Sequence, residues 1–599
     1  MNSPPYLKHF PRRLALEFLL YALLTAFALH ATWLTWPDAV IDFSRELYLP
    51  WRVSCGDVLY RDLAYYFGPV SVYTNAILFV LLGHASIHAL FALNFAFWLA
   101  TLLALRALLR RITSPLAATL AVSSFILLFS FNRYTDIGND NFLAPYSHEI
   151  TRGFLFALLA LLSLDSAFRR FPDGPPQARA SARFLLPGFF CALVLFSKPE
   201  LALAATAALA VLFALYACRR RAIPLRPLFA FALAVLSTIV FVVAPFAIAF
   251  RSVPRAFHET FLKLYLDCLR PALTSLPYFK SVLGMDAPLA NSLRLLRGVV
   301  LAGIPFLFAR LALPRLSSRP LRICVTVLLS ALAAAIAWKA WPDLNAALPA
   351  APLVLLGVIL LHGRRGTPAP SGIPENPAAG IPPLAIAFAL FAFALTSKII
   401  LNAGVFHYGF VLALPAFCCA VLLLSLPPCS SHRFVVVVAL LVGFSVSALL
   451  IQSSVFRRWD VSHGIHDDSF LASPLDSRAF EAALDWIRSH TPPDSTLAVL
   501  PEGAILNVLS GRPNPTPYVS LPITDWLRYD EPSLLAAWSN HPPDTLVLVQ
   551  TTQNRFGIDY ANSLFSLLDS LYEPALTITV PSPSGPRPYL LVATRIASP

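Results

Sequence analysis

The sequence predicts a polytopic α-helical membrane protein with a small C-terminal α/β domain. Of its 599 residues, 57% are hydrophobic and only 13% are charged, and the mean hydropathy is +0.67. Soluble domains are about 45–50% apolar and about 25% charged. The composition therefore argues against a cytosolic enzyme, a disordered chain and a protein that binds nucleic acid.

Charge divides the chain into two parts near residue 454. Residues 455–599 carry 9 Lys and Arg against 15 Asp and Glu, a charge of −6, which leaves +19 of the total for residues 1–454. A basic, apolar part followed by an acidic, more polar part predicts a membrane domain and a separate soluble domain. All eight cysteines lie in the first part without CxxC spacing or a neighbouring His cluster, so nothing predicts a metal site.

The first element is an apolar run behind a basic N-terminus. The residues MNSPPYLKHFPRR precede a stretch that stays apolar to about Trp36, which is too long for a signal peptide and predicts an uncleaved span. Crossing the hydrocarbon layer takes about 20 apolar residues. On that measure, windows that qualify predict about 13 transmembrane helices: 15–36, 85–109, 113–131, 149–168, 183–198, 199–218, 227–250, 292–310, 321–341, 345–362, 382–398, 405–426 and 434–452.

Two segments decide on which side each loop lies. Residues 69–83 are apolar but short, and a helix lying on the membrane surface suits the arginines that follow them. Residues 184–217 would make one helix of roughly 50 Å, so we expect a break at Lys198-Pro199, where proline removes a backbone donor. The short basic clusters then share one face, which the positive-inside rule makes cytoplasmic. The loop 37–84 and the C-terminal domain lie on the other face.

The tail 455–599 alternates helical and strand patterns. Residues 478–490 have a helical period, and 496–503 have the pattern of a buried strand followed by a loop. A strand, a helix and two more strands are then predicted at 542–551, 558–571, 575–580 and 588–595. Two segments rich in Pro, Gly, Ala and Arg predict cytoplasmic loops without chemistry, at 171–182 and 364–381.

Polar residues concentrate in the loop 37–84, directly after the first span. The apolar spacing between Asp42 and Cys55 predicts a helix at the membrane interface. Acids at this depth are costly unless they are paired or face water, so the loop is a candidate site. Its charged residues alternate with aromatic ones and are Asp38, Asp42, Arg45, Glu46, Arg52, Asp57, Arg61 and Asp62.

This arrangement resembles the GT-C superfamily of glycosyltransferases. The resemblance rests on an acid after the first span, a G-x-x-L-Y-x-D turn (56–62), a Gly-Pro, a surface helix ending in F-x-x-x-G, and the FSKPE turn (196–200). The sequence is similar to the bacterial branch that includes the lipid A aminoarabinose transferase (ArnT), the Rgt-type galacturonosyltransferases and the protein O-mannosyltransferases. It departs from that branch in one motif, because the usual Asp-Glu pair is replaced by Asp42 and Phe43, with Glu46 as the next acid.

The resemblance implies transfer of a sugar from a polyprenyl-phosphate donor to a glycan, lipid or protein acceptor. The reaction would take place at the periplasmic face of the bacterial inner membrane, with the N-terminus in the cytoplasm. Attack on the anomeric carbon with inversion needs one base and one cationic clamp for the phosphate. We expect no cofactor; a divalent metal is compatible with this chemistry, but no motif indicates one. We expect Asp42 to be the base, because a partly desolvated carboxylate is a better base. We expect Lys198 to be the clamp, because an ammonium at a broken helix end either snorkels or meets an anion.

Further residues on the same face are candidates for binding the two substrates. They are Arg61, Arg133, Lys398 and His407 for the phosphate, Tyr60 for a sugar ring or the lipid, His148 and Glu149 for the acceptor, and Glu46 and Asp62 within the loop. Each candidate also has a purely structural interpretation. Asp42 also fits a helix cap or a partner of Arg45, Lys198 an interfacial anchor, and the other acids and histidines ordinary interfacial pairs.

Two other functional classes compete with the transferase. A transporter or lipid-carrier flippase would also need many spans and buried charges, but transport sites usually lie near the bilayer midplane. Here the acids cluster at one face, and the central helices carry almost no charge. A scaffold, or a ligase or polymerase of the O-antigen type, is a third possibility, but such ligases concentrate their polar residues in a large late loop. The early polar loop favours the transferase.

Overall fold

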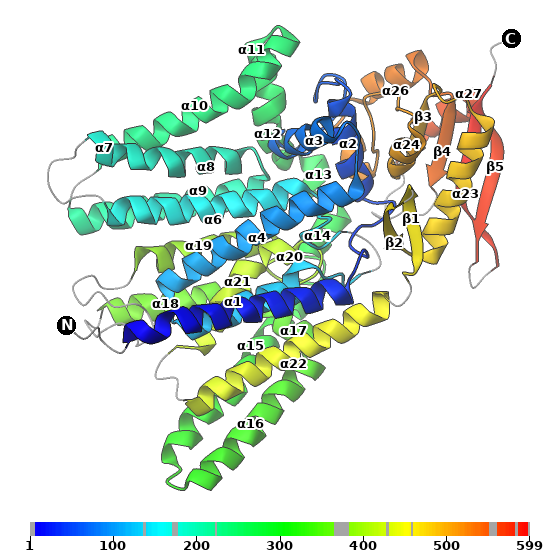
Figure 1. Ribbon diagram of the computed structural model, residues 1–599. Coiled ribbons are helices and arrows are strands. Elements are labelled where there is room, and N and C mark those ends of the chain that lie inside the picture. The colour runs from blue at the N-terminus through cyan, green and yellow to red at the C-terminus, as the bar shows by residue number, and fades with distance from the viewer. Residues whose placement is uncertain are drawn as a thin grey trace.

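The computed structural model describes most of the chain. The loop predicted at 364–381 lies almost wholly outside the described residues, as does most of the loop at 171–182. Within them the chain forms a large helical bundle and, beside one end of it, a smaller part built around a β-sheet (Figure 1). The described ranges are 6–135, 139–170, 178–221, 224–364, 382–426, 431–456, 459–465, 467–549, 560–581 and 585–596.

Eight helices in these ranges are long and apolar enough to cross a membrane. The candidate spans coincide with or overlap α1 (Tyr6–Ala31), α4 (Ile87–Ile112), α6 (His148–Arg169), α9 (Pro199–Arg220), α10 (Leu225–Phe250), α15 (Pro288–Ala312), α16 (Arg319–Lys339) and α22 (Ser431–Phe456). The other predicted windows coincide with shorter apolar helices, so the count of 13 spans stays a prediction. These are α5 (Pro115–Phe125) with its π-helical end η1 (Ile126–Ser130), α8 (Leu185–Leu195), α18 (Ala350–Arg364), α19 (Pro383–Thr396) and α21 (Leu414–Leu424).

Local sequence accounts for where several of these helices begin. The Ser86 side chain accepts a hydrogen bond from the backbone of Ala89 and caps α4, and Ser114 caps α5 with proline in the next position. The break predicted at Lys198-Pro199 is present. α8 ends at Leu195, Lys198 is extended (φ −109°, ψ 142°), and α9 begins at Pro199. Proline at this position disfavours helix in Lys198, and the polar turn follows from that.

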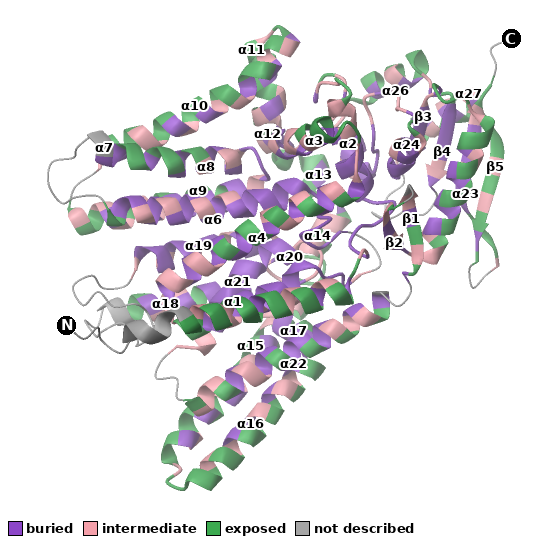
Figure 2. Cartoon of the chain, viewed as in Figure 1, coloured by how far each residue is buried: buried purple, intermediate pink, exposed green. Residues whose placement is uncertain are grey.

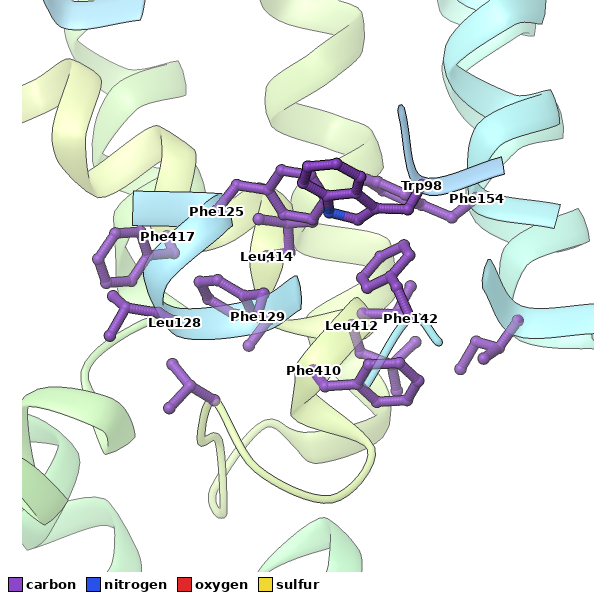
Figure 3. Packing of buried hydrophobic residues seen from close by; sticks show 14 of the residues in the cluster. Trp98, Phe125, Leu128, Phe129, Phe142, Phe154, Phe410, Leu412, Leu414 and Phe417 are labelled. Atoms are coloured by element: carbon purple, nitrogen blue, oxygen red, sulfur yellow. The ribbon is translucent and has the colours of Figure 1, made fainter. Parts of the chain in front are cut away.

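Aromatic side chains fill the centre of the bundle (Figure 3). The ring of Phe125 lies 5.2 Å from that of Phe142, which in turn lies 5.8 Å from Phe410. Trp98 is buried beside them and donates a hydrogen bond of 2.7 Å from its indole nitrogen to the Ser130 hydroxyl. Figure 2 shows exposed residues along α16, where leucines such as Leu328 face outward. An apolar outer surface of this kind suits a lipid environment.

Short helices connect the longer ones and shape the end of the bundle next to the sheet. The two helices predicted in the loop 37–84 are α2 (Phe43–Ser54) and α3 (Val70–Leu82). One face of α3 is exposed and apolar, whereas the first two turns of α2 are buried. The other connecting helices are α7 (Ala178–Ser181), α11 (Val253–Phe257), α12 (Lys263–Leu266), α13 (Pro271–Thr274), α14 (Pro277–Leu283), α17 (Trp341–Ala346) and α20 (Gly409–Leu412).

The C-terminal part contains a four-stranded sheet in the order β3-β4-β6-β5. β3 (Leu497–Leu500) pairs in parallel with β4 (Thr545–Val549), and β6 (Arg587–Arg595) runs antiparallel to both β4 and β5 (Tyr572–Val580). The strand and helix patterns of the sequence located this sheet, α23 (Pro474–His490) and α27 (Asn562–Leu571). They missed the hairpin of β1 (Val461–Ile465) and β2 (Asp468–Ala472), and the short helices α24 (Ile505–Ser510), α25 (Ile523–Trp526) and α26 (Glu531–Asn540).

Hydrogen bonds hold the C-terminal part against the bundle. Asp468 accepts bonds of 2.8 and 2.7 Å from the backbone nitrogens of Ile87 and His88 at the start of α4. A carboxylate is favourable at this position because the first amides of a helix lack partners within it. Farther along, the backbone nitrogen of Ala64 donates to the carbonyl of Pro517 at 2.9 Å. The part of the loop 37–84 around α2 lies between the bundle and the C-terminal part (Figure 1).

Candidate functional site

Asp42 lies at the start of α2 in an unusual backbone conformation. Its φ of 51° and ψ of −55° are rare for a residue with a side chain, and such strain is often kept at functional sites. Its side chain makes no capping hydrogen bond to α2 but forms an ion pair of 3.3 Å with Arg45, and 21% of it is exposed. The carboxylate faces a narrow cleft whose opposite wall includes Glu502 and Ser520 of the C-terminal part. Asp42 therefore lies beside residues of the C-terminal part.

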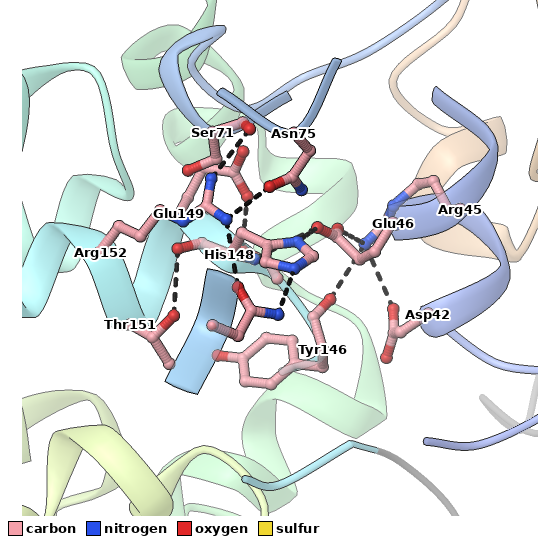
Figure 4. A network of polar contacts seen from close by, with 12 residues as sticks. Asp42, Arg45, Glu46, Ser71, Asn75, Tyr146, His148, Glu149, Thr151 and Arg152 are labelled. Atoms are coloured by element: carbon pink, nitrogen blue, oxygen red, sulfur yellow. Dashed lines mark hydrogen bonds and ion pairs between the residues drawn. The ribbon is translucent and has the colours of Figure 1, made fainter. Parts of the chain in front are cut away.

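Arg45 connects Asp42 to the surrounding segments (Figure 4). Its guanidinium donates to the Tyr66 hydroxyl at 2.9 Å and to the backbone carbonyl of Tyr146 at 3.3 Å. One of its terminal nitrogens also contacts both Asp42 and Glu46, at 3.3 and 3.4 Å. A planar guanidinium with five donors suits such a branching point.

Lys198 is buried on the other side of Tyr146, with 3% exposure. Its ammonium lies 3.9 Å from the centre of the Tyr146 ring and 4.4 Å from that of Phe67. Within the described ranges it has no hydrogen bond and no ion pair, because Glu200, the acid two residues along, is bound by Lys398 at 2.8 Å. Burial lowers the pKa of Lys198 to about 7, a fall that Glu200 opposes and Lys398 reinforces. A buried cation held only by ring faces is arranged to receive an anion.

Further buried donors near Lys198 also lack partners among the described residues. The hydroxyl of Tyr146, whose ring contacts Lys198, has none, nor has the hydroxyl of Tyr65, whose ring centre lies 5.8 Å from that of Phe67. The Nε atom of Arg45 is likewise buried without an acceptor. Buried polar groups are normally paired, so several unpaired donors in one region suggest a ligand rich in acceptor oxygens.

The turn that carries Lys198 is fixed by its contact with the loop 37–84. A Cβ atom added at Gly68 would lie 1.7 Å from the carbonyl oxygen of Phe196. Only glycine permits this approach, which brings the Gly-Pro segment of the loop onto the FSKPE turn. Tyr60 supports the same segment by donating to the carbonyl of Phe67 at 2.5 Å. Two motifs that lie more than a hundred residues apart in the sequence therefore form one surface.

The remaining candidates fall into three groups. Glu46 and His148 are buried and hydrogen-bonded to each other behind Arg45, and Glu149 is buried and accepts a hydrogen bond from Ser147 (Figure 4). Lys398 forms an ion pair with Glu200 close to Lys198, and its ammonium lies 4.7 Å from the centre of the Tyr408 ring. The others make contacts of their own: the Arg61–Asp62 pair at 2.7 Å, Arg133 with Asp38 at 3.0 Å, and His407 with the Tyr278 hydroxyl at 3.0 Å.

Several residues of this region were not singled out from the sequence. Asn94, a polar residue within an apolar span, was a signal that could have been read. Glu502 and Arg528 gave no signal, because nothing local places residues of the tail beside the loop. Among the described residues, no group of three or more His, Cys, Asp or Glu side chains could hold a metal ion, and a reaction without a metal stays a prediction.

Comparison with known proteins shows a likeness of fold and none of sequence. No family model and no curated protein matches the chain. The oligosaccharyltransferase of Archaeoglobus fulgidus, in complex with Zn and sulfate, matches with a TM-score of 0.52 and 14% identity over 95% of this chain and 73% of that one. Its apo form matches with a TM-score of 0.51, 13% identity, and coverage of 96% and 74%.

A second solved protein is similar over nearly its whole length. ArnT from Cupriavidus metallidurans, bound to undecaprenyl phosphate, matches with a TM-score of 0.43 and 13% identity over 96% of this chain and 98% of that one. Both neighbours are GT-C superfamily glycosyltransferases. The likeness to the oligosaccharyltransferase confirms the predicted resemblance to the GT-C superfamily at the level of the fold.

Proposed function

We propose that this protein is a membrane glycosyltransferase that takes a sugar from a polyprenyl-phosphate donor. The observation that carries the proposal is the buried ammonium of Lys198, which contacts two aromatic rings, makes no ion pair with a described residue, and lies across Tyr146 from the Arg45–Asp42 pair. A phosphate would supply the missing negative charge and the acceptor oxygens for nearby hydroxyls. The GT-C fold of the oligosaccharyltransferase neighbour supports the same class of activity.

The donor phosphate is proposed to bind at Lys198, with Tyr146 contributing its unpaired hydroxyl. The ammonium would neutralise the negative charge that grows on the leaving phosphate as its bond to the anomeric carbon breaks. Because Lys198 is already buried and held by two rings, little reorganisation is needed when the donor enters.

Asp42 is proposed to act as the base. The acceptor would approach Asp42 from the side of Glu502 and Ser520, where the narrow cleft would have to widen to admit it. Asp42 takes the proton of the attacking hydroxyl while the new bond to the anomeric carbon forms. The polyprenyl phosphate leaves with the electron pair of the broken bond, and the configuration inverts. This single displacement uses protein side chains alone and requires no covalent intermediate.

The site is assigned to the periplasmic face of a bacterial inner membrane. This orientation rests on the arginine clusters, which would be cytoplasmic by the positive-inside rule and lie at the opposite ends of the spans. The N-terminus would then be cytoplasmic and the C-terminal part periplasmic. The glycan, lipid or protein that accepts the sugar would approach from the periplasm, and the donor from the surrounding bilayer.

The test is transfer by the full chain in lipid nanodiscs that contain a panel of polyprenyl-phosphate sugars. Asp42→Asn should lower turnover by about 10²- to 10⁴-fold, the usual contribution of a general base, while donor binding is retained. Asp62→Asn is the matched control, because that acid is paired with Arg61 on the surface and should keep most of the activity. Normal turnover by Asp42→Asn would remove it as the base, and a wild-type chain that uses none of the donors would overturn the proposed function.

A further inference from the structure

A chain of buried polar side chains lies behind Arg45 and has no part in the mechanism above (Figure 4). A terminal nitrogen of Arg152 contacts the side-chain oxygen of Asn94 at 3.1 Å. The amide nitrogen of Asn94 lies 2.9 Å from Nε2 of His148, and Nδ1 of His148 lies 2.5 Å from a carboxylate oxygen of Glu46. All four side chains are at most 3% exposed and come from α2, α4 and α6.

The direction of every hydrogen bond in this chain is determined by its neighbours. Arg152 can only donate, so the atom of Asn94 that it contacts must be the oxygen. The nitrogen of Asn94 donates to the carbonyl of Leu143 at 2.9 Å and, with its second hydrogen, to His148. Nε2 of His148 therefore accepts, and the neutral ring carries its proton on Nδ1. That proton points at Glu46, which accepts it as a carboxylate.

Glu46 has two further donors, one on each carboxylate oxygen. The backbone nitrogen of His148 donates to it at 3.2 Å, and Arg45 contacts its second oxygen at 3.4 Å. Burial raises the pKa of Glu46, and the charge of Arg45 opposes that rise most strongly. The donors from His148 favour the ionised form in the same way. Without them the buried carboxyl would gain a proton more readily.

A consequence follows for Asp42. The same terminal nitrogen of Arg45 contacts Asp42 at 3.3 Å and Glu46 at 3.4 Å, so the two carboxylate oxygens are at most about 6.7 Å apart. While Glu46 is ionised, its negative charge repels that of Asp42 and weakens the attraction between Arg45 and Asp42. Both effects make Asp42 hold a proton more tightly than it would if it had Arg45 to itself.

We propose that Glu46 is a positioning residue that raises the proton affinity of Asp42. The hydrogen-bonded chain through His148, Asn94 and Arg152 keeps Glu46 ionised, and the ionised carboxylate competes with Asp42 for the contact with Arg45. That Asp42 is the base rests on the proposed function; the coupling between the two acids does not. Other groups also face the pair and stay unchanged in the test below. They are Glu502, Lys198, Asp140, Tyr66 and Tyr146 around Asp42, and Lys198, Glu149 and Arg152 around Glu46.

The test measures the protonation of Asp42 directly. A carbodiimide reacts with protonated carboxyl groups, and peptide mass spectrometry of the full chain in nanodiscs gives the labelling of Asp42 at each pH. Glu46→Gln should move the midpoint of this labelling to lower pH by about one unit, because Arg45 then no longer contacts a second charged carboxylate beside Asp42. Glu46→Asp keeps the charge and should stay nearer the wild type. The labelling of Asp62, which is paired with Arg61, should not move.

His148→Phe provides a second, independent variant. It leaves the Glu46 carboxyl in place but removes its ring donor, so the midpoint for Asp42 should move in the same direction as in Glu46→Gln. Combining the two substitutions should shift it no further than Glu46→Gln alone. Unchanged midpoints in both single variants would overturn the inference even if Asp42→Asn abolishes transfer. Conversely, shifted midpoints in a chain that transfers no sugar would support the coupling and overturn only the proposed function.

Discussion

Binding of the lipid-linked donor should weaken as the pH rises through about 7, because Lys198 loses its charge there. Burial lowers the pKa of Lys198 to about 7. A lysine is charged below its pKa, so about nine tenths of the molecules would carry the charge at pH 6 and about one tenth at pH 8. If only the charged form binds well, the affinity should fall about tenfold between these values.

At low pH, the loss of donor affinity in a variant without the Lys198 charge can be worked out from the contact between the ammonium and the phosphate. A hydrogen bond to a charged group contributes about 1.5–3 kcal/mol, which corresponds to about 10- to 150-fold in affinity. Lys198 is almost fully buried, so no water replaces the phosphate contact easily, and the upper half of this range is expected. Lys198→Met removes the charge but keeps the length of the side chain. It should bind the donor weakly and without dependence on pH.

The assay is titration of the protein in nanodiscs with a polyprenyl-phosphate sugar at several pH values. The donor is a phosphodiester whose single charge stays constant, whereas a free lipid phosphate takes up a second proton near pH 6 and would obscure the result. Lys198→Arg keeps its charge throughout and should give an affinity that does not change with pH. If the wild type shows no pH dependence, or if Lys198→Met binds like the wild type, Lys198 is an interfacial anchor and the clamp must be sought elsewhere.

Two further predictions test the topology and the packing of the site. A reporter fused after residue 460 should be active outside the cytoplasm, since the proposed orientation has the arginine clusters on the cytoplasmic face; a cytoplasmic signal would reverse the proposed orientation of the site. Gly68→Ala should destabilise the protein by about 1–3 kcal/mol, measured as a lower midpoint of thermal unfolding, because its Cβ would overlap the carbonyl oxygen of Phe196. Gly303→Ala, where nothing lies within 4 Å of the added atom, is the control; equal effects of the two would refute the close packing.

Much of the architecture follows from local patterns in the sequence. Each predicted span coincides with a helix because a run of apolar residues needs no distant partner to be recognised. The break at Lys198 follows from the proline next to it. The sheet of the tail was found because its strands are short apolar runs separated by turns. The hairpin β1–β2 was missed, since its strands, VSHGI and DSFLA, are partly polar and too short to show a period.

The candidate site was less predictable because its parts come from distant segments. The sequence suggested a cation at 198 and an acid at 42. Nothing local shows that Tyr146 lies between them or that Glu200 forms its ion pair with Lys398. The helix α2 also shows this limit. Its apolar spacing predicted a position at the membrane interface, whereas its first turns are buried and Tyr48 binds the backbone of Asn514 at 2.9 Å. The apolar face of α2 therefore packs against other parts of the protein and not against lipid.

The boundary near residue 454 separates two compositions, but it does not separate the site from the tail. The cleft at Asp42 has Glu502 and Ser520 on its far wall. Arg528 of the same part lies 4.0 Å from the ring of Tyr66, whose hydroxyl binds Arg45. Contacts through Tyr66 and Arg45 thus connect Arg528 to Asp42. Residues of the tail therefore form one wall of the candidate site, and truncation at residue 454 should remove that wall of the cleft at Asp42.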